Sequence, residues 1–179
     1  MKKALLVIDV QNEYFNGKLR VTYPSNSLDN ILKVMDYAKA NNMIIILVQH
    51  TAFSGETFVK DSNEWEIHPE ILKKHYDYHI EKTKPSSFHK TNLEEIFEKE
   101  NIEGVVISGY MTQMCCDTTA REAFHKGYAV EFLSDATGTI DVSNKVGTIS
   151  SKDLHNATLM AQSLGFSNVL SSQDWMDIK

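Results

Sequence analysis

Short runs of apolar residues recur along the chain, and a stretch with helical spacing follows most of them. The first two runs, residues 4–10 (ALLVIDV) and 43–49 (MIIILVQ), are apolar at nearly every position, which is typical of strands buried on both faces of a sheet. Between them, apolar side chains recur at helical spacing from Leu28 to Ala38. This alternation predicts strand–helix units and a parallel sheet.

The alternation of strands and helices continues to the end of the chain. Further short strands are predicted at residues 78–81, 104–108, 129–133 and 167–170. Helices are predicted after a capping box at Thr91–Glu94, over about residues 113–125, and after a second capping sequence at Ser150–Asp153. The buried face of the last helix is expected to contain Leu154, Ala157, Thr158, Ala161 and Leu164.

The predicted elements define the fold class. A closed barrel of strand–helix units requires about eight units and ~250 residues, whereas this chain has 179 residues. We therefore expect one α/β domain, residues 1–179, with an open, doubly wound, six-stranded parallel sheet flanked by helices on both faces. In such a sheet, ligands bind beyond the carboxyl ends of the strands, where the strand order reverses.

Composition and charge exclude several functional classes. Hydrophobic residues make up 42% of the chain and charged residues 23%, which are ordinary values for a folded soluble protein. The formal net charge is -6 and no long basic run occurs, so a nucleic-acid partner is not expected. The apolar runs are too short to span a bilayer or to act as a secretion signal, so we expect a cytoplasmic protein with no membrane partner.

Three polar residues lie where predicted strands end or lead into helices. Asp9 closes the first apolar run, Lys82 follows the third strand, and Cys115 lies between the fourth strand and the next helix. Each alone has an ordinary explanation: a capping carboxylate, a solvated surface lysine, or a buried inert thiol. Together they supply a base, a cation and a nucleophile at one edge of the sheet, which favours a single catalytic site.

The chain contains 2 cysteines, Cys115 and Cys116, and neighbouring cysteines rarely have the geometry for a mutual disulfide bond. Cys115 is expected in the first turn of a helix. There the helix dipole and the free backbone N–H groups favour a thiolate and an oxyanion. Cys116 is expected to be a small core residue.

Parts of the chain resemble the isochorismatase-like cysteine hydrolases, a family that includes nicotinamidases and N-carbamoyl amidohydrolases. The resemblance is carried by residues 5–15 (LLVIDVQNEYF), 82–88 (KTKPSSF), 109–115 (GYMTQMC) and 118–123 (TTAREA). The order and spacing of these segments agree with the family over residues 3–139. The second segment selects Lys82 rather than Lys84 as the functional lysine.

The resemblance implies a catalytic triad of Asp9, Lys82 and Cys115. It also implies a non-proline cis peptide bond at Tyr110–Met111 and an oxyanion hole formed by the backbone N–H groups of Met111 and Cys115. The implied assembly is a homodimer or a larger homo-oligomer. The implied reaction is acyl transfer, in which Asp9 takes the Cys115 proton, the thiolate attacks an amide-like carbonyl, and water cleaves the thioester.

Two departures from the family limit the choice of substrate. The metal-binding Asp/His cluster that nicotinamidases carry after the second strand is reduced here to His50, with no carboxylate before Glu56. A metal ion requires three or four preorganised ligands, so no metal and no other cofactor is expected. Relatives that cleave isochorismate lack the cysteine, so Cys115 argues against that reaction.

The candidates for contact with a substrate are Tyr14, Phe15, His50, Phe88, Tyr110 and Thr112. The Tyr14, Phe15 and Phe88 rings either form the pocket wall or pack in the core, and His50 either reaches the pocket or caps the second strand. The long loop over residues 50–69 is either a lid or an ordinary surface loop. His155 is expected to be structural.

These observations lead us to expect a cysteine hydrolase that cleaves an amide-type C–N bond of a small molecule. Two alternatives stay open. One is a family relative that hydrolyses an ester or an enol ether, and the other is a scaffold protein that keeps the fold without turnover. Only the amidase hypothesis requires Cys115.

Overall fold

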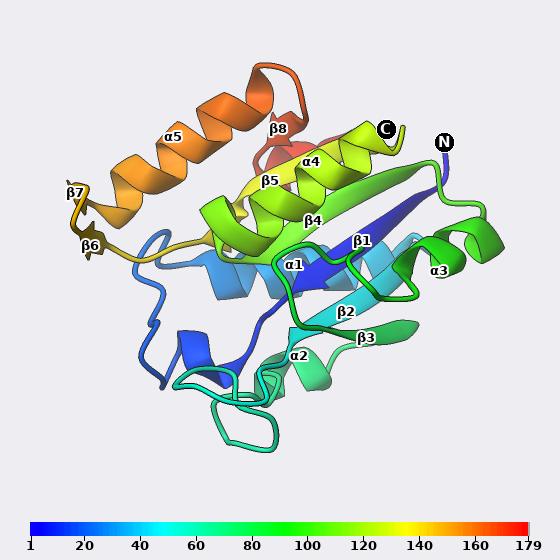
Figure 1. Cartoon of the computed structure of the whole chain (residues 1–179). Helices are drawn as coiled ribbons and strands as arrows, with labels where there is room; N and C mark the ends of the chain where they lie inside the picture. Colours follow the sequence, from blue (N-terminus) through cyan, green and yellow to red (C-terminus); the bar gives the residue numbers. More distant parts are fainter. Residues whose placement is uncertain (179) are drawn as a thin grey trace.

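The structure, a computed structural model, describes residues 1–178 and centres on a six-stranded parallel sheet (Figure 1). The strand order is β3-β2-β1-β4-β5-β8, and every neighbouring pair is parallel. The strands are β1 Lys3–Ile8, β2 Ile44–His50, β3 Tyr78–Lys82, β4 Gly104–Tyr110, β5 Ala129–Gly138 and β8 Asn168–Leu170. The predicted α/β fold with a six-stranded parallel sheet is confirmed.

The strand order reverses next to β1. The chain runs outward from β1 to β2 and β3, then returns to place β4 on the other side of β1 before it continues to β5 and β8. The carboxyl ends of β1 and β4 are therefore the switch point at which an open sheet of this kind binds ligands. Gly109 in β4 allows a close approach there, because a Cβ at this position would collide with the carbonyl oxygen of Ile8.

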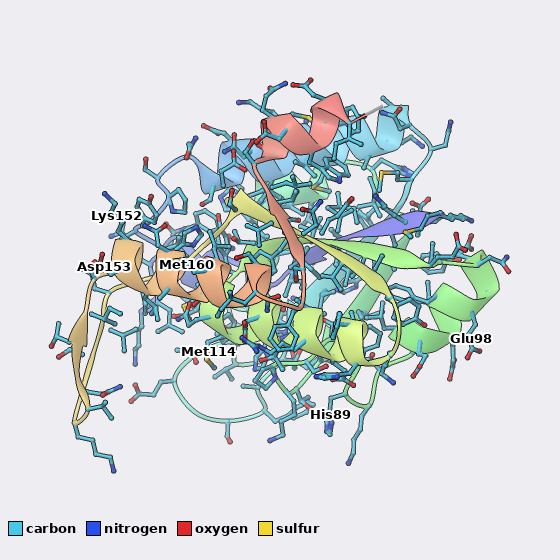
Figure 2. The ribbon with its side chains drawn as sticks, turned by 90° about the horizontal axis from the view of Figure 1, so that it is seen from above. His89, Glu98, Met114, Lys152, Asp153 and Met160 are labelled. Carbon is cyan, nitrogen blue, oxygen red and sulfur yellow. The ribbon has the colours of Figure 1, made fainter. Side chains whose placement is uncertain are left out.

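Helices cover both faces of the sheet, as Figure 2 shows from above. One face carries α1 Ser27–Ala40 and α6 Ser172–Asp177. The other face carries α3 Leu93–Glu100, α4 Asp117–His125 and α5 Ser151–Ser163. Each layer closes its own hydrophobic core against the sheet. None of the helices within residues 1–178 has the length and apolar character needed to cross a membrane.

Several short elements are missing from the sequence-based prediction. They are η1 Asn12–Tyr14, α2 Pro69–Leu72, the hairpin of β6 Val142–Asn144 and β7 Gly147–Ile149, and the helix α6. Elements of this length are too short to show a period. In addition, β5 extends to Gly138. The prediction ended this strand at Leu133 because the residues that follow (SDATG) do not continue the apolar run.

One of the two predicted helix caps is confirmed. The Ser150 side chain caps α5 by accepting a hydrogen bond from the backbone N–H of Asp153 at 3.1 Å. The capping box at Thr91–Glu94 is wrong, because α3 begins after Asn92, whose side chain makes no capping bond. The Thr91 hydroxyl donates to the Ser87 carbonyl at 2.6 Å and accepts the backbone N–H of Leu93, rather than that of Glu94, at 3.3 Å.

The apolar face predicted for α5 is only partly present: Leu154, Thr158 and Ala161 are half-buried, but Ala157 and Leu164 are exposed. The buried side chains of this helix are Ser151, His155 and Gln162. By contrast, Leu164 is 89% exposed and Met160, labelled in Figure 2, is 69% exposed. The physical reason is hydrogen bonding: the two ring nitrogens of His155 lie 2.8 Å from the Thr112 hydroxyl and 2.8 Å from the Ser134 carbonyl. These contacts turn the polar side of the helix inward.

Candidate active site

The end of β1 places Asp9 at the switch point. Asp9 follows Ile8 directly, has a φ of 52°, and donates its backbone N–H to the Val48 carbonyl at 2.8 Å. Asp tolerates the left-handed region better than most residues do, and here this conformation ends the strand. The carboxylate is 0% exposed, so it requires a compensating partner.

That partner is Lys82, which lies at the end of β3. The β2–β3 register sets Lys82 opposite His50. Lys82 Nζ lies 2.7 Å from Asp9 Oδ2, 3.1 Å from His50 Nδ1 and 3.2 Å from Cys115 Sγ. Because an ammonium group has three N–H donors, these contacts use all of its donors. Lys84, by contrast, is exposed.

Cys115 lies in a π-helical turn rather than in the first turn of an α-helix. This turn, η2 Thr112–Cys116, joins β4 to α4. The Tyr110–Met111 peptide bond that precedes it is cis. Cys115 is 6% exposed, and Cys116 is completely buried as a core residue. The predicted position of Cys115 in an α-helical first turn is therefore wrong, because the chain makes one wider turn before α4 begins.

The charges around the thiol oppose one another. Burial raises the pKa of Cys115 well above its usual range, the Asp9 carboxylate raises it further, and Lys82 acts in the opposite direction. Burial alone would lower the pKa of Lys82, but Asp9 and Cys115 hold it above its usual value. Burial and Asp9 thus favour the protonated form of the Cys115 thiol. This direction is opposite to the one expected from the helix dipole.

The side-chain amide of Gln11 fixes the backbone of His50. Gln11 Oε1 accepts the His50 backbone N–H at 2.8 Å, and Gln11 Nε2 donates to the His50 carbonyl at 2.9 Å. The same Nε2 also donates to the Trp65 carbonyl at 2.6 Å. His50 is half-buried, and both burial and Lys82 lower the pKa of its imidazole. A neutral ring fits the acceptor role of His50 Nδ1.

An aromatic cluster lies beside this polar group. The centroid of the Tyr14 ring lies 5.3 Å from that of Phe58, which in turn lies 5.2 Å from that of His50. The Phe15 and His68 centroids lie 4.2 Å apart. Tyr14 and His50, two of the residues predicted to contact a substrate, thus both pack against Phe58. Phe58 was not singled out in the sequence, because an isolated ring in a long loop carries no periodic signal.

Of the other predicted pocket residues, Tyr110 belongs to this cluster, because its ring centroid lies 5.3 Å from that of Tyr14 and 5.9 Å from that of Phe15. Phe88 and Thr112 make contacts elsewhere. The Phe88 ring lies 5.7 Å from that of Phe97, centroid to centroid, in the core beneath α3. The Tyr110 hydroxyl lies 3.0 Å from Ser27 Oγ in α1, and the Thr112 hydroxyl points to α5. Of the two roles considered for Phe88, these contacts favour core packing.

The long loop that follows β2 is tied to the segment after β1. The backbone N–H of Asn12 donates to the Glu66 carbonyl at 2.9 Å, and the N–H of His68 donates to the Val10 carbonyl at 2.9 Å. The Trp65 carbonyl accepts from Gln11, as described above. These bonds tie the last part of the loop, residues 65–68, to the segment after β1.

Asp9, His50 and Cys115 also form the one group within residues 1–178 whose ligand atoms could hold a metal ion, since these atoms lie within 4.8 Å of one another. The Lys82 ammonium, however, contacts all three residues. A metal ion among them would meet a buried positive charge at close range. The donor set therefore fits an ammonium group better than a metal, and the absence of a metal stays a prediction.

Comparisons with known proteins agree with the fold. Residues 3–174 match the model of the isochorismatase domain. The chain is 32% identical over 172 residues to a secreted isochorismatase effector of Verticillium dahliae, covering 96% of this chain and 88% of the relative. It is 33% identical over 177 residues to nicotinamidase 3 of Arabidopsis thaliana, covering 91% and 81%. A crystal structure from Burkholderia xenovorans LB400, named for isochorismatase, matches with a TM-score of 0.95 at 38% identity, covering 97% of this chain and 85% of that one. The chain is therefore a member of the isochorismatase family of hydrolases.

Proposed function

We propose that the chain is a cysteine amidohydrolase, which cleaves an amide-type C–N bond of a small molecule through a thioester on Cys115. The observation that carries this proposal is the Lys82 ammonium, which lies 2.7 Å from Asp9 Oδ2 and 3.2 Å from Cys115 Sγ. A nucleophile, a base and a fixed cation at the switch point are the groups that acyl transfer requires. The Arabidopsis relative, an amidase by its name, supports the same class of reaction.

The first half of the proposed reaction transfers the acyl group to Cys115. Asp9 Oδ2 is bound to Lys82, whereas the buried Oδ1 has no hydrogen-bond partner among the described residues. Oδ1 is therefore the oxygen that accepts the Cys115 proton as the sulfur attacks the carbonyl carbon. The C–N bond breaks when Asp9 passes this proton to the leaving nitrogen, which gives a thioester and a free amine.

The second half releases the acid. Asp9 takes a proton from water, the resulting hydroxide attacks the thioester carbonyl, and the C–S bond breaks as Cys115 regains a proton. In both halves the backbone N–H groups of Met111 and Cys115 are the proposed donors to the oxyanion. Lys82 stays protonated throughout, because Asp9 and Cys115 raise its pKa. It offsets the negative charge that moves between these two groups.

A panel of small amides, N-carbamoyl compounds, esters and enol ethers tests the proposal. We expect amide turnover by the wild type and by the matched control Cys116→Ala. We expect Cys115→Ala to lose about 10⁴-fold or more of this turnover, because it lacks the nucleophile. Mass spectrometry of the quenched reaction should show the acyl group on Cys115.

Other outcomes of this panel would favour the alternatives. Ester or enol-ether turnover that survives Cys115→Ala would replace the thioester mechanism with another hydrolysis. The absence of turnover on every compound, together with equal labelling of Cys115 and Cys116 by a small electrophile, would favour a scaffold protein that keeps the fold.

We also propose that the chain forms a homo-oligomer in the cytoplasm. The outward face of α5 supports the first part, because Met160 and Leu164 expose apolar surface that an intermolecular contact would bury. The location within the cell rests on the sequence alone. One relative, from Verticillium dahliae, is secreted by its name, so fractionation of the producing cells and their medium is the test.

A further inference from the structure

His50 makes a contact that the proposed reaction does not use. Its Nδ1 lies 3.1 Å from Lys82 Nζ, and an ammonium group donates hydrogen bonds but cannot accept them. His50 Nδ1 must therefore carry a lone pair, which places the ring proton on Nε2. One imidazole tautomer is thus specified by the geometry of the site.

We propose that His50 is a positioning residue, which holds the Lys82 ammonium between Asp9 and Cys115 by accepting its remaining N–H at Nδ1. The effect on the amide reaction rests on the proposed function. The contact itself and the chosen tautomer do not.

The surroundings of His50 fix its ring in the position that this role requires. Gln11 holds its backbone through hydrogen bonds of 2.8 and 2.9 Å. The Phe58 ring meets the imidazole at an interplanar angle of 68°. The β2–β3 register places Lys82 directly opposite. Backbone, ring and partner are thus each held by a different part of the chain.

Removal of the His50 acceptor would change the position of Lys82. Lys82 is 1% exposed, so water cannot readily replace a lost partner. A buried donor without an acceptor is costly, and the ammonium therefore has to rotate or shift. Either movement changes its contact with Cys115 Sγ, which is now 3.2 Å away.

The charges that face His50 keep its ring neutral. Burial lowers its pKa most, Lys82 and Lys84 lower it further, and Asp9 acts in the opposite direction. Cys115 also lies close to the ring, and burial raises the pKa of its thiol. A neutral imidazole keeps the Nδ1 lone pair available to Lys82, so the electrostatics support the contact.

Three substitutions of His50 separate the possible roles of the ring. Asn places an oxygen near the position of Nδ1, Gln reaches the position of Nε2, and Phe keeps only the ring. We would measure the rate at which iodoacetamide alkylates Cys115, by mass spectrometry at constant pH, with His89→Phe as an exposed histidine control.

If His50 positions Lys82, Cys115 should be alkylated about tenfold more slowly in His50→Phe and His50→Gln than in the wild type. The reason is that both variants leave a buried N–H of the Lys82 ammonium without an acceptor. His50→Asn should recover most of the rate. Equal rates in all three variants would overturn the proposal and leave only a packing role. Recovery by His50→Gln instead of His50→Asn would also overturn it, because Nε2 would then be the important atom.

The tautomer can be observed directly in the unmodified protein. Nitrogen-15 NMR of the wild type should show the Nε2–H form of His50 at neutral pH. Its titration midpoint should rise in Lys82→Met, because a neighbouring positive charge has been removed. The Nδ1–H form, or an unchanged midpoint, would overturn the proposal.

Neither measurement requires amide turnover, so the two proposals can fail separately. A chain with the expected tautomer and alkylation rates that hydrolyses no amide contradicts only the proposed function. Amide turnover with the Nδ1–H tautomer contradicts only the role of His50.

Discussion

Two buried polar regions lie on either side of η2 and differ in how completely their hydrogen bonds are satisfied. The α5 seam consists of Thr112, His155 and the Ser134 carbonyl, and the strand-end site consists of Asp9, His50, Lys82 and Cys115. In the α5 seam both ring nitrogens of His155 have partners at 2.8 Å. In the strand-end site the buried Oδ1 of Asp9 has none among the described residues. In the α5 seam, where the ring nitrogens are fully hydrogen-bonded, the polar groups connect elements of the fold. In the strand-end site, an acceptor without a partner is available to a reacting group.

The largest effect should come from breaking the ion pair of the strand-end site. Asp9→Asn removes the proposed base and should lower amide turnover by about 10²–10⁴-fold. It also leaves a buried ammonium unpaired, which should reduce the free energy of unfolding by about 3–5 kcal/mol. The double variant Asp9→Asn, Lys82→Met should be less destabilised than the sum of the two single variants, as measured by urea unfolding.

An exposed ion pair supplies the control for the comparison of the Asp9 and Lys82 variants. Lys74 Nζ lies 2.6 Å from Asp36 Oδ2, and the Asp36 side chain is 63% exposed. Asp36→Asn should therefore change the stability far less than Asp9→Asn does. Two outcomes would show that Asp9 and Lys82 are not energetically coupled. One is a similar loss of stability in Asp36→Asn and Asp9→Asn, and the other is a loss in the double variant equal to the sum of the losses in the two single variants.

A smaller change in the free energy of unfolding is expected when the pH is lowered and His155 in the α5 seam takes up a proton. Burial lowers the pKa of His155 below that of an unfolded histidine, which is about 6.5. The unfolded chain therefore takes up a proton first as the pH falls. The stability that neutral His155 contributes is complete above about pH 6.5 and is lost as the pH falls toward its folded pKa. His155→Gln should show a shallower loss of stability between about pH 7 and pH 5 in urea titrations.

The control for the α5 seam is His89→Gln, because His89 is exposed. This variant should keep the wild-type slope of stability against pH. His50 also has a lowered pKa, so part of the slope should survive in His155→Gln. An unchanged slope in His155→Gln would show that His155 is not held neutral by the fold.

The smallest effect on stability is expected on the outside of α5, where no polar region is involved. Leu164→Gln and Met160→Gln should change the free energy of unfolding by no more than about 0.5 kcal/mol, since both residues are exposed. If α5 forms the proposed contact between copies, sedimentation should show a shift toward monomer. Lys152→Gln, an exposed change on the same helix, should not cause this shift. An unchanged oligomer in both apolar variants would place the contact elsewhere.

The strands could be predicted because burial on both faces demands apolar residues at every position. β1, β2 and β4 lie in the middle of the sheet, and their sequences contain this signal directly. The fold class and the switch point follow from their order along the chain. The strand-end position of Asp9 follows in the same way, because this residue closes a recognisable apolar run. Lys82 follows a strand without such a run (YHIEK) and is selected by the resemblance of residues 82–88 to the family.

Other features depend on partners that lie far away in the sequence. The inward face of α5 is set by Thr112 and Ser134, and neither is marked by the helical period of residues 151–163. The place of Phe58 beside His50 depends on the path of a loop whose residues show no repeat. Burial likewise raises the pKa of Cys115, whereas the helix dipole was expected to lower it, because the loss of water around the sulfur disfavours the thiolate.

β1 precedes the other strands of the sheet along the chain, yet it occupies the middle of the finished sheet. Ile8 pairs with Gly109 in β4, and pairings between such distant strands form late because the intervening chain must first be closed into a loop. Asp9 and Lys82 are both synthesised before Cys115 exists. A nascent chain therefore carries two of the proposed catalytic groups but no nucleophile, and β4 must dock before the third can reach them. The order of synthesis thus delays assembly of the proposed catalytic site until β4 has docked.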